Sequence, residues 1–352
     1  MVDLSAHLKQ MLSSSGLSGF EDPIRKILQE TWEPLMDELS VSKIGSLHGL
    51  KRGVGEPPRR SVLISAHMDA IGMMVTEVQD GLLRITEIGG IDHRILPGQL
   101  VTVHGREDMP GVVVQPPAHL LPEDVGDSPV KMKYLLVDIG YRPEEVAQKV
   151  RVGDTVSFAQ SPLELTGEAL AGHTLDNRVS VAATTLCLEI LQNRIHSWDV
   201  WAVASVQEEE TFAGALTSPF DIRPDLAIVI DVCFAKGPGS NDWRSLPFGE
   251  GVGIGYGPNI HPAMCEAFEK KAKALEIPFH RDLMPKMSGT DAMAVQIVAE
   301  GIPCAVLGIP LRYMHTPVET VSLKDIRRAG RLMGEFIADL TPDALDQIRW
   351  EE

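Results

Sequence analysis

The sequence predicts an α/β protein in which a mixed-sheet α/β/α domain is interrupted by a small, β-rich, barrel-like insert. Residues 74–168 differ in texture from both ends of the chain, because short β-type runs there are closely punctuated by glycines and prolines. Outside them, apolar strands alternate with helices, and strands such as "DLAIVIDV" are apolar throughout, which is typical of a sheet covered on both faces. We therefore assign residues 1–73 and 169–352 to one large domain.

The first part of that domain is expected to contain two helices and a strand. "MVDLSAHLKQML" predicts an amphipathic helix with Leu4, Leu8 and Leu12 on one face. "IRKILQETWEPLMDEL" predicts a second helix that is interrupted near Pro34. "SVLISAHMDAIGMMVTEV" opens with an apolar strand at residues 62–64.

The insert and the second part of the large domain follow in order. The insert contains the β-type runs "LLRITEI", "GQLVTVHG", "GVVVQPP", "YLLVDIG" and "DTVSF", and one helix at "RPEEVAQKV". Beyond residue 172, helices are predicted at "NRVSVAATTLCLEILQN", "HPAMCEAFEKKAKAL" and "SLKDIRRAGRLMGEFIADL". Strands are predicted at "DVWAVASVQ", "DLAIVIDV" and "PCAVLGIP". The sequence contains no internal repeat.

Composition excludes several classes of function. A formal net charge of -17 argues against a nucleic-acid partner, which needs a basic surface. The apolar stretches are far shorter than the ~20 residues that span a bilayer, and the N-terminus has no apolar signal core, so we expect a cytoplasmic protein. The cysteines are scattered and predict neither a disulfide framework nor a zinc knot; they are Cys187, Cys233, Cys265 and Cys304.

Polar residues lie where the predicted strands end. In open α/β sheets, ligands bind at the carboxyl ends of strands, so loops from several strands can bring these side chains to one edge. Imidazole and carboxylate together suit zinc, and also cobalt or manganese. Two such ions need about three protein ligands each, with one carboxylate able to bridge. The residues that meet this count are His67, Asp176, Glu209, Asp231 and His315.

Taken singly, these residues have simpler interpretations. A His-x-Asp sequence after a strand is more often a surface turn than a ligand. The three adjacent glutamates of "VQEEE" are usually a charged loop, and Asp176 can be a helix cap. Only the joint arrangement favours a metal site over these alternatives.

Eight stretches of the chain together match a known family. They are "SAHMDAIGMMV", "IGGIDHRILPGQLVTVHG", "PPAHLL", "VRVGDTVSF", "GHTLDNR", "VQEEE", "SGTDA" and "GIPLRYMHTPVE". These stretches follow the order found in one family and cover nearly the whole chain. By them the chain resembles the dinuclear metallo-aminopeptidases of the glutamyl and tetrahedral (TET) type, a family also labelled endoglucanase or cellulase. The resemblance implies a phosphorylase/hydrolase-like metallopeptidase domain and peptide substrates with a free N-terminus. It also implies two divalent ions per subunit, zinc or cobalt or else manganese.

The resemblance also implies a role for each ligand. His67 and Asp231 would bind one metal, Glu209 and His315 the other, and Asp176 would bridge the two. The β-rich insert would be a dimerisation domain, and dimers would assemble into a hollow dodecamer. We expect no partner among nucleic acids or membranes.

Two further residues would support the chemistry. Asp69 would accept the second ring N–H of His67, and Glu208 would act as the general base for the attacking water. Related enzymes commonly have a cis bond after the bridging aspartate, so we expect one between Asp176 and Asn177.

Two positions depart from the family pattern. Glu210 stands where an apolar residue followed by glycine is usual, and Ala70 replaces the glutamate of "HMDE". Side chains alternate along a strand, so the successive glutamates cannot all face the metals, and we expect Glu210 to point away from the face of Glu209. Lys236 follows the strand of Asp231, where it either lines a pocket for an acidic N-terminal residue or is a solvated loop lysine.

Other functions remain open at this stage. A polysaccharide hydrolase usually needs two carboxylates across a sugar bond and no histidine-bound metal, so the donor set argues against it. A metal-dependent deacylase would use the same chemistry on substrates with a blocked amine. A non-enzymatic protein with this fold would be expected to have a broken ligand set, and none is visible.

Overall fold

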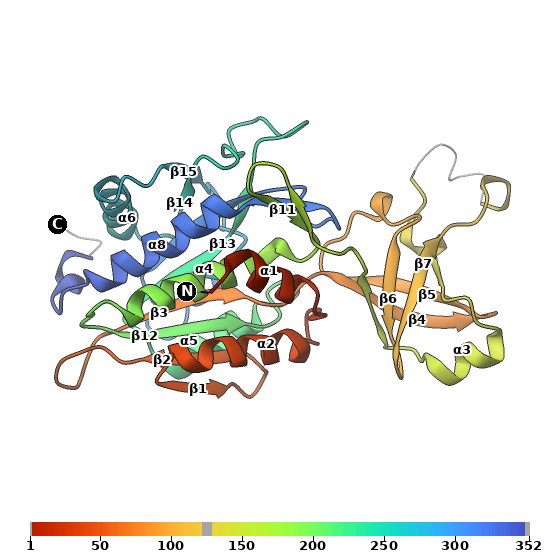
Figure 1. Cartoon of the computed structure of the whole chain (residues 1–352), viewed down its shortest axis with the longest axis horizontal. Helices are drawn as coiled ribbons and strands as arrows, with labels where there is room; N and C mark the ends of the chain where they lie inside the picture. Colours follow the sequence, from red (N-terminus) through yellow and green to blue (C-terminus); the bar gives the residue numbers. More distant parts are fainter. Residues whose placement is uncertain (1, 122–128, 349–352) are drawn as a thin grey trace.

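A computed structural model describes residues 2–121 and 129–348 of the chain. Figure 1 shows a large α/β domain and a smaller β-barrel beside it. The chain leaves the large domain after β3 (Ser61–His67), forms the barrel, and returns through β10 (Leu163–Leu165) and β11 (Ala169–Gly172). This arrangement confirms the predicted α/β protein with a β-rich insert.

The large domain is built on an 11-stranded mixed sheet. Its central strands β12, β3, β13 and β16 are parallel to one another, whereas β2, β14 and β17 pair with them in the antiparallel sense. Both β13 and β16 are buried along almost their whole length, which requires cover on both faces of the sheet. Its remaining strands are β1 (Glu38–Val41), β2 (Leu47–Lys51), β12 (Asp199–Ser205), β13 (Leu226–Phe234), β14 (Val252–Tyr256), β15 (Phe279–Leu283), β16 (Cys304–Arg312) and β17 (Glu319–Ser322).

Helices pack against this sheet, and α1, α4 and α8 lie in front of it in Figure 1. The apolar face predicted for the first helix is buried at Leu4, Leu8 and Leu12. Where α8 crosses α4, a Cβ at Gly330 would lie 2.7 Å from the carbonyl oxygen of Ala183, so only glycine allows this contact. The helices are α1 (Leu4–Leu12), α2 (Asp22–Trp32), α4 (Leu175–Gln192), α5 (Ala213–Ile222), α6 (Pro262–Ala274), α7 (Ala292–Val295) and α8 (Leu323–Ala338).

The barrel closes in the order β4-β5-β8-β7-β6-β9 and has a hydrophobic core of its own. Helix α3 (Pro143–Lys149) packs against it, as the sequence predicts. Residues 163–165 lie outside this barrel, because β10 pairs with β11 in the large sheet. The barrel strands are β4 (Gly72–Gln79), β5 (Leu82–Ile88), β6 (Leu100–His104), β7 (Asp108–Val114), β8 (Leu136–Asp138) and β9 (Thr155–Phe158).

Smaller predictions can also be compared with the structure. All four cysteines are buried and unpaired, as expected. In the described part of the chain, no helix has the length and apolar character needed to cross a membrane. Helix α2 ends at Trp32, two residues before Pro34, so the predicted interruption is confirmed. Short 3-10 helices lie at Glu33–Leu35, His93–Ile95, Ala118–Leu120, Met132–Tyr134 and Ala344–Gln347.

Candidate active site

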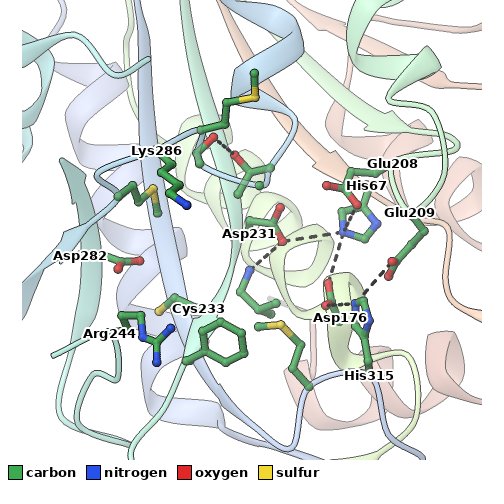
Figure 2. A pocket seen from close by; sticks show the side chains of 18 of the residues that line it. His67, Asp176, Glu208, Glu209, Asp231, Cys233, Arg244, Asp282, Lys286 and His315 are labelled. Atoms are coloured by element: carbon green, nitrogen blue, oxygen red, sulfur yellow. Dashed lines mark hydrogen bonds and ion pairs between the residues drawn. The ribbon is translucent and has the colours of Figure 1, made fainter. Parts of the chain in front are cut away.

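The parallel strands of the large sheet carry the candidate residues to one edge. His67 is the last residue of β3, Asp231 lies toward the end of β13, and the turn with Glu208 and Glu209 follows β12. His315 follows β16, and Asp176 lies at a kink in the first turn of α4. Figure 2 shows these side chains pointing toward one another.

The two histidines share one carboxylate. Oδ1 of Asp176 lies 3.3 Å from Nε2 of His67, and Oδ2 of the same side chain lies 3.4 Å from Nε2 of His315. Asp231 Oδ1 is 3.7 Å from Nε2 of His67, and Glu209 Oε2 is 3.4 Å from Nε2 of His315. The structure therefore brings all five predicted ligands together, with Asp176 between the two histidines.

Each histidine directs its second ring nitrogen away from the cluster. Nδ1 of His67 lies 3.2 Å from the backbone carbonyl oxygen of Asp69 and 3.4 Å from its carboxylate, and Nδ1 of His315 lies 2.8 Å from the carbonyl oxygen of Gly90. A proton on each Nδ1 satisfies these acceptors and leaves both Nε2 atoms as lone-pair donors toward the cluster. This tautomer is the one that a metal ligand needs.

Asp69 does more than the sequence predicts. Its carboxylate also accepts the backbone N–H groups of Glu208 (3.0 Å) and Glu209 (3.2 Å). Asp69 is fully buried. One side chain thus sets both the ring of His67 and the turn that carries the two glutamates.

That turn corrects an expectation from the sequence. Strand β12 ends at Ser205, and residues 208–211 form a turn rather than an extension of the strand. The turn follows Gln207, whose φ is 59°, so the alternation expected for three strand residues is wrong. Glu210 instead accepts a hydrogen bond from the backbone N–H of Gly89 (2.6 Å), in the loop that leaves β5.

Two acidic residues in the matched motifs have contacts that sequence reasoning missed. Glu319, in "HTPVE", accepts the backbone N–H groups of Asp176 (3.1 Å) and His315 (2.8 Å). Asp291, in "SGTDA", accepts hydrogen bonds from the hydroxyls of Ser65 (2.7 Å) and Ser205 (2.6 Å). The signal was present in the motifs, but strand periodicity alone assigns no partner to an acid in a loop. The peptide bond between Asp176 and Asn177 is cis, as predicted.

Electrostatics show that the cluster attracts positive charge. Burial raises the pKa of Glu208 to about 10, that of Glu209 to about 8 and that of Asp231 to about 6. Burial would lower the pKa of His315, but the carboxylates of Asp176 and Glu209 outweigh it and raise that pKa to about 9. Carboxylates outnumber imidazoles here, so the metal-free cluster holds protons that a bound cation would displace.

The cluster forms one end of a cavity of about 730 Å³. Lys236 is exposed and does not line this cavity, so the pocket role considered for it is wrong. Ala70 is fully buried and lies outside the cavity. Figure 2 shows Arg244, Asp282 and Lys286 at the other end, and the lining also includes Phe234, Trp243 and Met287.

The large sheet gathers imidazoles and carboxylates at the ends of its parallel strands, where they could hold a metal ion, so the fold and the site point to a metal-dependent enzyme. Comparison with known proteins identifies the family. The chain belongs to the M42 glutamyl aminopeptidase family, whose model matches residues 45–332. It is therefore a peptidase, and the family consists of metal-dependent aminopeptidases.

Individual relatives extend over the whole chain. A lysyl aminopeptidase of Pyrococcus furiosus is 33% identical, and the match covers 95% of this chain and 97% of that protein. A TET aminopeptidase from a marine-sediment Thaumarchaeota archaeon has a TM-score of 0.92 at 29% identity, covering 98% and 99% of the two chains. The Pyrococcus horikoshii TET1 peptidase, which can assemble into a tetrahedron or a large octahedral shell, has a TM-score of 0.83 at 27% identity, covering 96% and 100%.

Proposed function

We propose that this protein is a dinuclear aminopeptidase that removes N-terminal residues from peptides. The observation that carries the proposal is the position of Asp176, whose two oxygens face two different histidines at 3.3 and 3.4 Å. One shared carboxylate between two donor sets is the arrangement that two neighbouring ions require.

The donor set fits such ions. His67 and Asp231 would hold one ion, Glu209 and His315 the other, and Asp176 both. Nitrogen and oxygen donors of this kind suit zinc or cobalt, and manganese as well. When bound, divalent ions lower the pKa of water and polarise a carbonyl.

Glu208 is the residue that moves the proton. Its carboxylate lines the cavity and lies 3.7 Å from Nε2 of His67, while its backbone is held by Asp69. It would accept a proton from the attacking water and pass that proton to the leaving amine, so that one group serves as base and then acid.

Metal reconstitution tests the proposal against its alternatives. The protein is stripped with a chelator, reloaded with zinc, cobalt or manganese, and assayed on aminoacyl-nitroanilides, on their N-acetylated forms and on cello-oligosaccharides. We expect two ions per chain by inductively coupled plasma mass spectrometry and release only from substrates with a free amine. Preference for the acetylated forms would indicate a deacylase, sugar release would indicate a glycosidase, and full activity without metal would refute the proposal.

We also propose that the insert, residues 74–168, mediates dimerisation and that dimers assemble into a dodecamer. Two observations support this. Leu100 and Val152 of the barrel have exposed fractions of 67% and 63%, and such apolar side chains favour burial against a partner. The similar Pyrococcus horikoshii TET1 peptidase can assemble into a tetrahedron or a large octahedral shell.

A further inference from the structure

The end of the cavity opposite the histidines contains the buried carboxylate of Asp282. Asp282 lies on β15, lines the cavity and has an exposed fraction of 7%. Within residues 2–121 and 129–348, no hydrogen bond or ion pair reaches its side chain. By contrast, the buried carboxylates of Asp291 and Glu319 each accept two hydrogen bonds. An isolated buried carboxylate is costly unless a ligand supplies its partner.

The sheet leaves Asp282 facing the same space as the proposed metal ligands. Gly308 of β16 is in register with Asp231 of β13 on one side and with Gly253 of β14 on the other. A Cβ at Gly308 would lie 2.8 Å from Sγ of Cys233 and 3.5 Å from Oδ2 of Asp282. The carboxylate of Asp282 therefore reaches toward the strand next to Asp231, beside the thiol of Cys233, and neighbouring strands are only about 4.8 Å apart.

The cations near this end of the cavity do not neutralise Asp282. The guanidinium of Arg244 is bound to Asp242, with Nε 2.8 Å from Oδ2, and 65% of its side chain is exposed. Lys286 is exposed. In Figure 2 both side chains lie, like Asp282, on the far side of Asp231 from the histidines. The buried carboxylate is therefore the charge that a side chain entering this end of the cavity would meet.

We propose that Asp282 selects peptides whose first residue is lysine or arginine. This inference rests on the proposed aminopeptidase function, which places the free amine and the scissile bond at the histidine end. The first side chain then extends across Gly308 toward Asp282, and its cation pairs with the buried carboxylate. Phe234 and Trp243, which line the same cavity, provide apolar surface for the alkyl stem.

The pH dependence of selection follows from the site. Burial raises the pKa of Asp282 to about 6 in the empty cavity. The carboxylate is neutral below that pH and charged above it, so selection for a cationic side chain rises as the pH increases from 5 to 7. Norleucine has a similar apolar stem without the charge, which makes the lysyl to norleucyl ratio of kcat/KM the appropriate measure.

The decisive variant is Asp282→Asn, which retains size and removes charge. We expect kcat/KM for lysyl- and arginyl-nitroanilide to fall about 10- to 100-fold, the usual cost of losing a hydrogen bond to a charged group. Hydrolysis of norleucyl-nitroanilide should change less than about threefold, because norleucine has no cation that could pair with the carboxylate of Asp282. Asp80→Asn, the same change at an exposed turn of the barrel outside the cavity, serves as the matched control and should leave the lysyl to norleucyl ratio unchanged.

The outcomes separate this inference from the function on which it rests. If the metal-loaded protein hydrolyses no free-amine substrate, the proposed function fails. If it hydrolyses norleucyl-nitroanilide but the ratio is the same in Asp282→Asn, the role of Asp282 alone is refuted. A preference for glutamyl substrates that Lys286→Ala abolishes would refute it too. If Asp282→Asn does not fold, a wild-type ratio that stays flat between pH 5 and 7 decides against the proposal, and a rising ratio supports it.

Discussion

Replacing Glu208 with glutamine should separate proton transfer from metal binding. The change keeps the shape of the side chain and the backbone hydrogen bond to Asp69 at 3.0 Å, but an amide cannot accept the proton of the attacking water. Loss of a general base typically costs a factor of ~10² to 10⁴ in rate, which is about 3 to 5 kcal/mol of barrier. The fold should be retained, because the substitution removes one negative charge from a cluster of buried carboxylates. The ion pair that it removes is the one with His67.

The assay combines three measurements on one preparation. We expect kcat on a free-amine nitroanilide to fall by that factor at saturating metal, while mass spectrometry still finds two ions per chain and circular dichroism finds an unchanged Tm. Because the loss occurs in proton transfer, excess metal should not restore activity.

The neighbouring glutamates are the controls. Glu209→Gln weakens a proposed ligand that lies 3.4 Å from Nε2 of His315, so one ion should be lost and activity should partly recover at high metal concentration. Glu210→Gln should change little, because an amide oxygen can still accept the N–H of Gly89. If Glu208→Gln lost metal while Glu209→Gln kept both ions, the two roles would be reversed. Identical behaviour of all three variants would refute the assignment of a general base and a metal ligand to this turn.

The remaining predictions concern support, assembly and acid stability. Asp69→Ala should weaken metal binding about 10- to 100-fold by calorimetric titration, because two backbone N–H groups lose their acceptor and Nδ1 of His67 keeps only the backbone carbonyl of residue 69; an unchanged affinity would contradict this role. Light scattering should detect a dodecamer in metal-replete buffer, and a monomer active at all concentrations would exclude it. Burial lowers the pKa of His7 to about 4, below the 6.5 of an unfolded histidine, so the unfolded state binds the extra proton between these values. The resulting stability, up to about 3 kcal/mol, is present above pH 6.5 and is lost as the pH falls through 4. His7→Gln should therefore reduce the change of the denaturant midpoint between pH 7 and 4. A variant whose midpoint changes with pH as much as that of the wild type would argue against this role of His7.

The sequence by itself determined several of the elements and the set of polar residues. Periodicity located β3, β13 and β16 and the apolar face of α1, because the pattern of apolar residues within a short segment predicts which face of a strand or helix is buried. The motifs supplied the five residues that the structure brings together, and the glycine- and proline-rich texture located the barrel.

Only the tertiary structure decided where the side chains point and which of them meet. The three glutamates turn away from the strand because Gln207 adopts a φ of 59°. The pattern of apolar residues in a sequence does not predict the dihedral angle of a single residue. Asp282 faces the same cavity as Asp231 because its carboxylate reaches across β14 toward Gly308 of β16, the residue in register with Asp231. Local propensity is enough to predict a strand. The order of the strands depends on contacts between residues far apart in the chain, and those contacts place the buried carboxylate of Asp282 at one end of the cavity.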